Sequence, residues 1–439
     1  MKEIQKYYHS LAFFRICFGL LMMVAELRFI AKGWITDFYV KPIYFFSFYG
    51  FEWIKPLPEP FIYWVFYVLI FLSLLIATGL FYRIAIVLFF ITFTYVELLD
   101  KSVYLNHYYQ VSLLAFLMCF LPMNKTYSID SFVLHLYKIR ILNLFNYTLN
   151  PKIALWALRI QVGLVYFFGG IAKLKSDWLF EAQPLKIWLN SHTEMPVLGY
   201  LFQWQMTPFL FSWAGLIFDL SAAFLLCFSA TRRYIYPVLV IFHILTYLLF
   251  NIGLFPWMMM LTALIFFESS WHQKVLEKCF PIAKKININH SISNNYIYFI
   301  LIPFFTFQAL MPFRSFLYKG NVLWHEQGFR FAWNIMLMEK KGFTEYRVTF
   351  KNTRETITVR PEEFLNTIQT KQMSFQPDMI LQFAHFLHQY YLENNLGETE
   401  IKVDCFVTLN GKLSRLLVDP NIDLTKEKDN FEDKKWILP

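Results

Sequence analysis

Long runs of apolar residues recur along the chain between Leu11 and Phe313. A helix that crosses the hydrocarbon core of a bilayer needs about 20 predominantly apolar residues. The runs therefore predict a polytopic α-helical membrane bundle of about nine spans, of which the third is short. The predicted spans lie at residues 11–31, 60–80, 84–99, 103–122, 153–173, 209–229, 234–250, 252–268 and 295–313.

One apolar stretch is too long to form a single span. Residues 234–267 are 34 consecutive uncharged positions, which as one helix would extend about 51 Å against a hydrocarbon core of about 30 Å. Glycine and proline are the strongest local breakers of regular structure. We therefore predict a break near Asn251, Gly253 and Pro256, which makes the number of spans odd.

Lysine and arginine residues are divided unequally between the two sets of loops. If the N-terminus lies inside, nine spans place thirteen of these residues on the inner side and six on the outer side. Cytoplasmic loops carry the excess of positive charge in membrane proteins. We therefore expect a cytoplasmic N-terminus and an extracytoplasmic C-terminal region. Because Arg15 and Glu26 interrupt the first run and no small-x-small site follows it, we expect this span to be retained.

The pattern changes after residue 313, where shorter alternating segments replace the long apolar runs. We predict two domains, a transmembrane domain of residues 1–313 and a small extracytoplasmic α+β domain of residues 314–439. In the second domain, helical periodicity covers residues 378–393, and Asn410 with Gly411 is a strong hairpin signal because both tolerate positive φ. The predicted strands lie at residues 345–350, 355–360, 401–409 and 412–418.

Composition and charge support this division. Hydrophobic residues make up 57% of the chain and charged residues 16%, which excludes an ordinary soluble protein. The net charge of +9 belongs entirely to residues 1–313, where the basic residues fall in short loops between apolar runs. We therefore expect the lipid bilayer as a partner and no nucleic acid. Cys405 is the only cysteine after residue 313, which excludes a disulfide within the second domain.

Strongly polar residues inside the spans are costly and usually face the bundle interior. With the predicted orientation, Asp100, Lys101, Asn106, His107 and Lys173 converge near the outer membrane face, below the second domain. The polar residues within the predicted spans are Arg15, Asn106, His107, Arg159, Gln161, Lys173, Asp219 and His243.

Each of these residues also has a structural explanation. Arg159 and Asp219 could form a buried ion pair, and Lys173 could extend from the end of its helix to water. Phe167 and the paired Gly169 and Gly170 favour a desolvated Lys173 instead, because glycines permit close helix approach and aromatic side chains exclude water. A neutral lysine can act as a general base. The sequence thus predicts a possible base in an aromatic-lined pocket that is accessible from the lipid.

Metal and nucleotide chemistry find little support. His107 and His243 have no second ligand at i+3 or i+4, and the chain contains no HExxH, paired-cysteine, GxGxxG or Walker motif. His385 and His388 are spaced i,i+3, but no third ligand is evident. We expect no metal.

Several segments carry a resemblance to a known family. They are residues 99–109 (LDKSVYLNHYY), 159–161 (RIQ), 166–174 (YFFGGIAKL) with Asp177 and Trp178 after it, 219–222 (DLSA), 242–243 (FH), 251–255 (NIGLF), 332–334 (AWN) and 418–420 (VDP). Together, and in this order, they resemble the vitamin K-dependent gamma-glutamyl carboxylase family over nearly the whole chain.

The resemblance implies an integral membrane enzyme with its active site on the lumenal side. Such an enzyme couples the oxygenation of vitamin K hydroquinone, or of menaquinol, to the carboxylation of glutamates in a protein or peptide. O₂ and CO₂ are the co-substrates. Oxygenation yields a base strong enough to remove a γ-proton from glutamate, in a site that must exclude water.

The resemblance also implies roles for individual residues. Lys173 matches the base that deprotonates the hydroquinone, and Asn106 and His107 match the polar pair beside it. We expect these three to be catalytic. The residues expected to bind the cofactor are His243, Arg159 and Phe167, and those expected to bind the glutamate substrate are Trp333, Asn334 and Arg330.

The chain departs from the animal members of the family. Ala172 and Lys173 stand where those members have two adjacent lysines, and Lys175 and Asn334 stand where acidic residues occur. Because the chain stops at Pro439, before the longer lumenal region of animal members, the resemblance favours a prokaryotic member in a bacterial inner membrane. Two alternatives stay open: a quinol oxygenase or epoxidase without carboxylation, and a non-enzymatic transporter or receptor. The internal repeats of many transporters are not visible here.

Overall fold

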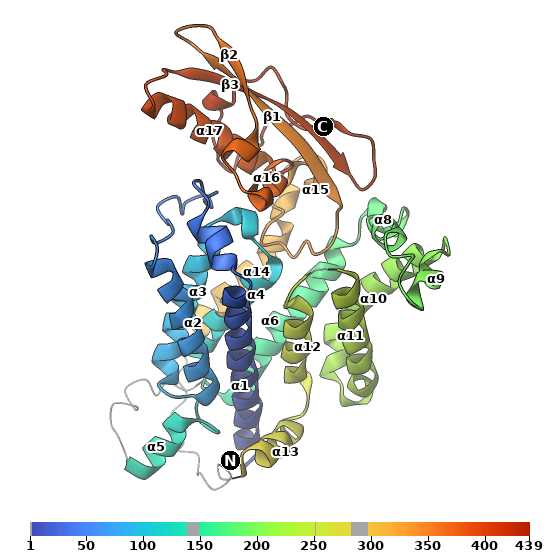
Figure 1. The fold of residues 1–439 in the computed structure, drawn as a ribbon. Coiled ribbons are helices and arrows are strands. Elements are labelled where there is room, and N and C mark those ends of the chain that lie inside the picture. Colours follow the sequence, from blue (N-terminus) through green and yellow to red (C-terminus); the bar gives the residue numbers. More distant parts are fainter. Residues whose placement is uncertain (1, 138–148, 251, 282–296) are drawn as a thin grey trace.

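The computed structural model describes residues 2–137, 149–250, 252–281 and 297–439. Figure 1 shows a bundle of helices with a small sheet domain at one end, while α1 begins at the opposite end. The helices before the sheet domain are α1 (Lys2–Ala31), α2 (Phe61–Thr78), α3 (Tyr82–Leu98), α4 (Asn106–Phe120), α5 (Ile129–Tyr137), α6 (Pro151–Ala172), α7 (Ser176–Leu179), α8 (Leu185–Asn190), α9 (Leu198–Phe202), α10 (Thr207–Cys227), α11 (Ser229–Leu249), α12 (Phe255–Ala263), α13 (Ser269–Cys279) and α14 (Tyr298–Leu310). The short helix α15 (Val322–His325) packs in the core of the sheet domain.

Five helical segments of the described residues are long and apolar enough to cross a membrane: Lys6–Ala31, Phe61–Thr78, Pro151–Ala172, Thr207–Cys227 and Tyr298–Leu317. They coincide with five of the nine predicted spans. The other four predicted spans also contain helices, but α3, α4 and α12 have only 17, 15 and 9 residues. A 15-residue helix extends about 23 Å, less than the hydrocarbon core. The predicted number of nine spans is therefore not confirmed.

The predicted break in the long apolar stretch is confirmed. Helix α11 ends at Leu249 and α12 begins at Phe255, with Gly253 at a φ of 62° and Pro256 in the first turn of α12. Asn251, also expected at the break, lies outside the described residues.

Two of the predicted polar residues tie helices together. Arg15 is fully buried and donates hydrogen bonds to the carbonyl oxygens of Ile76, Ala77 and Met123. Gln161 of α6 donates to Gln110 of α4 at 2.9 Å. The contacts of Arg15 fit a structural role, whereas Gln161 Oε1 and Gln110 Nε2 have no hydrogen-bond partner among the described residues.

The C-terminal region forms the predicted α+β domain. Its antiparallel sheet has the order β2-β1-β3-β4, from β1 (Lys340–Phe350), β2 (Thr356–Val359), β3 (Thr399–Leu409) and β4 (Arg415–Leu416). Helices α16 (Thr367–Met373) and α17 (Pro377–Glu393) pack with it around an apolar core. Asn410 and Gly411 have φ values of 52° and 75°, as the turn requires. The returning strand is shorter than predicted, because only Arg415 and Leu416 pair with β3.

The two regions are joined by polar contacts between α16 or α17 and the loop that precedes α4. Gln369 donates to Asp100 at 2.7 Å, and Lys101 forms an ion pair with Asp378 at 2.7 Å. Asp100 and Lys101 therefore contact the sheet domain, in agreement with their expected position below the second domain.

Candidate functional site

Lys173 follows the last residue of α6 and is buried against α10. Its Nζ lies 2.6 Å from Oδ2 of Asp219 and 3.2 Å from the carbonyl oxygen of Gly169. Gly170 permits this approach, since a Cβ at that position would lie 2.9 Å from the backbone nitrogen of Leu220. Gly170 thus allows α6 and α10 to place a buried amine against a buried carboxylate.

This ion pair corrects the predicted pairing of Asp219 with Arg159. Arg159 instead donates to the carbonyl oxygens of Ile265, Phe266 and Phe267, beyond the end of α12. The arginine and the carboxylate come from helices whose relative register could not be read from hydrophobic periodicity. Arg159 therefore binds a helix end and lies apart from Lys173.

Lys173 and Asp219 line a small aromatic cavity of about 110 Å³, here called the Lys173 cavity. His243 lines the same cavity, is 1% exposed and shares a 2.8 Å hydrogen bond with the Tyr166 hydroxyl. Its other ring nitrogen, Nδ1, has no hydrogen-bond partner among the described residues. The structure thus brings together three of the polar residues named in the spans: Lys173 at the end of α6, Asp219 of α10 and His243 of α11.

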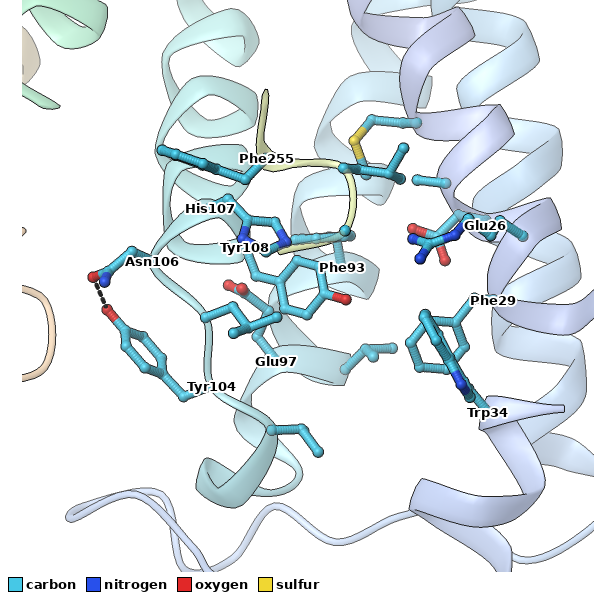
Figure 2. Close-up of a pocket in the computed structure, with 18 of the residues that line it drawn as sticks. Glu26, Phe29, Trp34, Phe93, Glu97, Tyr104, Asn106, His107, Tyr108 and Phe255 are labelled. Carbon is cyan, nitrogen blue, oxygen red and sulfur yellow. Dashed lines mark hydrogen bonds between the residues drawn. The ribbon is translucent and has the colours of Figure 1, made fainter. Parts of the chain in front are cut away.

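A second cavity, of about 490 Å³, lies on the other side of Phe255 and is here called the His107 cavity. His107 and Asn106 line it, with aromatic side chains around them (Figure 2). The amide oxygen of Asn106 accepts a hydrogen bond from the Tyr104 hydroxyl at 3.1 Å. Its nitrogen donates to the backbone carbonyl of Asn334 at 3.3 Å.

Two buried carboxyl groups in the His107 cavity were missed as candidate site residues. Glu97 accepts a 2.5 Å hydrogen bond from Ser112, whereas Glu26 is 5% exposed and makes no hydrogen bond or ion pair within the described part of the chain. Figure 2 shows both side chains among the residues that line the cavity. The sequence signal was available, because each acid interrupts an apolar run.

The two cavities share one wall, formed by Phe255, Ile335 and Met336. The Phe255 ring lies 5.9 Å from the His107 ring and 5.9 Å from the His243 ring, centroid to centroid. Lys173 and His243 are therefore on one side of this wall, and His107 and Asn106 are on the other. Phe167, a predicted cofactor-binding residue, packs on Phe168 and Phe224 and lines neither cavity.

The predicted substrate residues lie in the segment that approaches this wall from the sheet domain. Trp333 is 1% exposed and packs on Tyr109, and the Asn334 amide donates to the carbonyl oxygen of Phe329. Arg330 forms an ion pair with Asp378 at 2.7 Å. All three are held by contacts within the protein.

Comparison with known families gives this arrangement its context. Residues 5–271 match the HTTM domain, and residues 293–439 match the lumenal domain of the vitamin K-dependent gamma-carboxylase. The chain belongs to the vitamin K-dependent gamma-carboxylase family. No solved structure matches it.

Membership in the gamma-carboxylase family indicates an enzyme of gamma-carboxylase type. The apolar helices and the match to a lumenal domain fit a membrane protein with an extracytoplasmic domain. The domain that carries the wall residues Ile335 and Met336 is thus the one that the family places outside the cytoplasm.

The family name implies a reduced vitamin K as cofactor, and the His107 cavity, of about 490 Å³, has room for such a molecule. A quinol has an apolar ring with two hydroxyl donors. The His107 cavity offers aromatic walls together with the Glu26 carboxyl, which makes no hydrogen bond among the described residues. Within those residues, no three His, Cys, Asp or Glu side chains gather in a way that could hold a metal ion.

Proposed function

We propose that this protein couples oxygenation of a reduced vitamin K-type quinone, or menaquinol, to the carboxylation of glutamate side chains in a protein or peptide. The observation that supports this most is the buried Lys173–Asp219 pair in an aromatic cavity, in a chain of the gamma-carboxylase family. A quinol held by the residues of these cavities would supply, with O₂, the strong base needed to remove the γ-proton of glutamate, and CO₂ would supply the new carboxyl group.

Lys173 is the proposed base for the quinol hydroxyl, and Asp219 is its proton acceptor. The two groups lie 2.6 Å apart and both are buried. Because separated charges are poorly solvated in such an environment, a proton can pass from Lys173 to Asp219 and leave a neutral amine. The neutral amine can then take a proton from the quinol.

The sizes of the two cavities suggest where the quinol ring lies. A cavity of about 150 Å³ holds a benzene molecule, so the Lys173 cavity, at about 110 Å³, is too small for a two-ring quinol. The His107 cavity, at about 490 Å³, has the necessary room. We place the ring there, and Phe255, Ile335 and Met336 must shift for a ring hydroxyl to reach Lys173.

The remaining polar residues have supporting roles in this proposal. Asn106 and His107 face the ring from one side of the wall, and His243 supports the Lys173 side through its unpaired Nδ1. The aromatic lining excludes water, which would otherwise quench a carbanion. Arg159 and Phe167 act on helix packing rather than on the cofactor.

The proposed setting is a bacterial inner membrane, with a cytoplasmic N-terminus and the sheet domain outside. The excess of Lys and Arg in the predicted inner loops supports this orientation.

The test uses purified protein in detergent with reduced vitamin K, O₂, labelled bicarbonate and a short glutamate peptide. Quinone epoxide and peptide-bound label are followed together, beside the Lys173→Ala variant. We expect both products from the wild type and neither from the variant. Epoxide without label would indicate a quinol oxygenase, and the absence of both products would contradict the proposal.

A further inference from the structure

A third cavity lies where the sheet domain meets the bundle. It has a volume of about 290 Å³ and is lined by residues of both regions, including Phe48, Lys101, Arg314, Arg330, Asp378 and Phe431. We call it the junction groove. It differs from the other two cavities because charged residues make up much of its lining.

The charges of the junction groove do not balance. Lys101 and Arg330 share one carboxylate, since each lies 2.7 Å from Oδ2 of Asp378. Burial alone would raise the pKa of Asp378, but Arg330 and Lys101 hold it well below its ordinary value. Asp378 is therefore ionised, and this cluster of two cations and one anion keeps one positive charge.

Arg314 adds a second uncompensated positive charge. Its guanidinium donates to the backbone carbonyl of Arg330 at 2.6 Å and approaches the Met311 sulfur at 3.6 Å. Within the described residues it has no carboxylate partner. The other acids of the groove are already paired, because Glu326 lies 2.7 Å from Lys340 and Asp429 lies 3.1 Å from Lys434.

We propose that the junction groove binds an acidic side chain of the glutamate-containing substrate and that Arg314 is its carboxylate partner. This inference rests on the proposed function. A guanidinium with free N–H groups can hold a carboxylate through two parallel hydrogen bonds. Aromatic side chains flank the charges, and Phe431, 69% exposed and packed on Tyr49, lies at the open rim.

The position of the groove fits a substrate that must reach the His107 cavity. Phe331 lines the groove, and Tyr104 lines the His107 cavity. Their rings are 5.0 Å apart, and the Phe331 backbone N–H donates to the Tyr104 hydroxyl. The Phe331–Tyr104 pair thus connects the wall of the junction groove with the wall of the His107 cavity.

The experiment measures peptide binding without quinol. A fluorescent peptide with several glutamates is titrated with wild-type protein in detergent, and the same peptide with glutamine in place of glutamate serves as the second probe. We expect Arg314→Gln to weaken binding of the glutamate peptide about tenfold or more, because a buried carboxylate would lose its cation. The glutamine peptide should bind weakly to both proteins.

Two further variants complete the test. Lys319→Gln removes the same charge from an exposed position that does not line the groove, and it should bind like the wild type. Phe431→Glu places a negative charge at the exposed rim and should weaken binding of the glutamate peptide severalfold. If thermal unfolding shows that Arg314→Gln is not folded, peptide binding by Phe431→Glu tests the proposal in its place.

Wild-type affinity of Phe431→Glu and of folded Arg314→Gln for the glutamate peptide would overturn the proposal. Equal weakening for both peptides would also overturn it, because the contact would then not be with the carboxylate. The proposed function fails separately. If the wild type binds the peptide through Arg314 but shows no quinol-dependent carboxylation, the groove stands and the function does not. If Arg314→Gln carboxylates the peptide with an unchanged KM, the proposed function stands and the groove proposal does not.

Discussion

The Lys173 cavity and the His107 cavity differ in how their charged groups are satisfied. In the smaller cavity, Lys173 and Asp219 neutralise each other at 2.6 Å. In the larger cavity, the Glu26 carboxyl makes no hydrogen bond among the described residues. A buried pair can be retained for stability alone, whereas an unpaired buried carboxyl is costly and indicates a ligand. The proposed base and the larger cavity are thus on opposite sides of one wall.

The largest effect is expected for Asp219→Asn, which distinguishes a catalytic Lys173–Asp219 pair from a purely structural one. If Asp219 receives the proton of Lys173, turnover should fall by about 10²-fold or more while the KM for quinol stays unchanged. The variant should also lose about 3–5 kcal/mol of stability, because Lys173 is left without its counter-charge. Epoxide formation and denaturant unfolding measure the two quantities.

The double variant Lys173→Met with Asp219→Leu is the matched control. It should regain stability, since an apolar pair replaces the ion pair, but it should remain inactive. Activity in this double variant would show that the pair is structural only.

A smaller effect on kcat is expected from substitutions of Phe255, in the wall between the two cavities. Phe255→Trp adds volume between the cavities and should lower kcat about tenfold if a ring hydroxyl must pass toward Lys173, equivalent to about 1.4 kcal/mol. Phe255→Leu should leave kcat near the wild-type value. Phe299→Trp makes the same change on a side chain that is 78% exposed and serves as the control. An unchanged kcat in Phe255→Trp would mean that no ring crosses the wall.

The smallest effect concerns Glu26. Glu26→Leu should stabilise the protein by about 1–3 kcal/mol, because an unpaired polar group leaves the interior. It should also raise the KM for quinol by about 2- to 10-fold, the value of one neutral hydrogen bond. Glu26→Gln, which keeps polar atoms at the site, should show less of both changes. Greater stability of Glu26→Leu with an unchanged KM for quinol would show that Glu26 does not bind the quinol.

Much of the fold could be predicted from the sequence, because hydrophobic pattern reports burial directly. The break between α11 and α12 and the α+β domain followed from it. The number of spans did not, because an apolar helix such as α4 is also what the interior of a bundle requires. Hydropathy alone does not distinguish a helix that is covered by other helices from one that is covered by lipid.

The candidate site was predictable in part. Lys173, His107 and His243 could be found because polar residues are rare in apolar runs, but their partners depend on helix register and rotation. For that reason Arg159 was considered as the partner of Asp219, whereas the structure pairs Asp219 with Lys173. The backbone path of residues 331–336 could not be predicted, since Phe331, Trp333 and Met336 adopt positive φ values of 62°, 57° and 54° without being glycine.

The shared wall also has a consequence for the assembly of the protein. Ile335 and Met336 belong to the sheet domain, yet they close cavities whose other walls are bundle helices. Domains generally fold in the order of their synthesis, so we expect the helices that line the two cavities, from α1 to α12, to pack before residues 335 and 336 close them. A nascent bundle therefore has both cavities open on one side. We expect a chain truncated before residue 335 to lack the Ile335 and Met336 part of the wall that separates the two cavities.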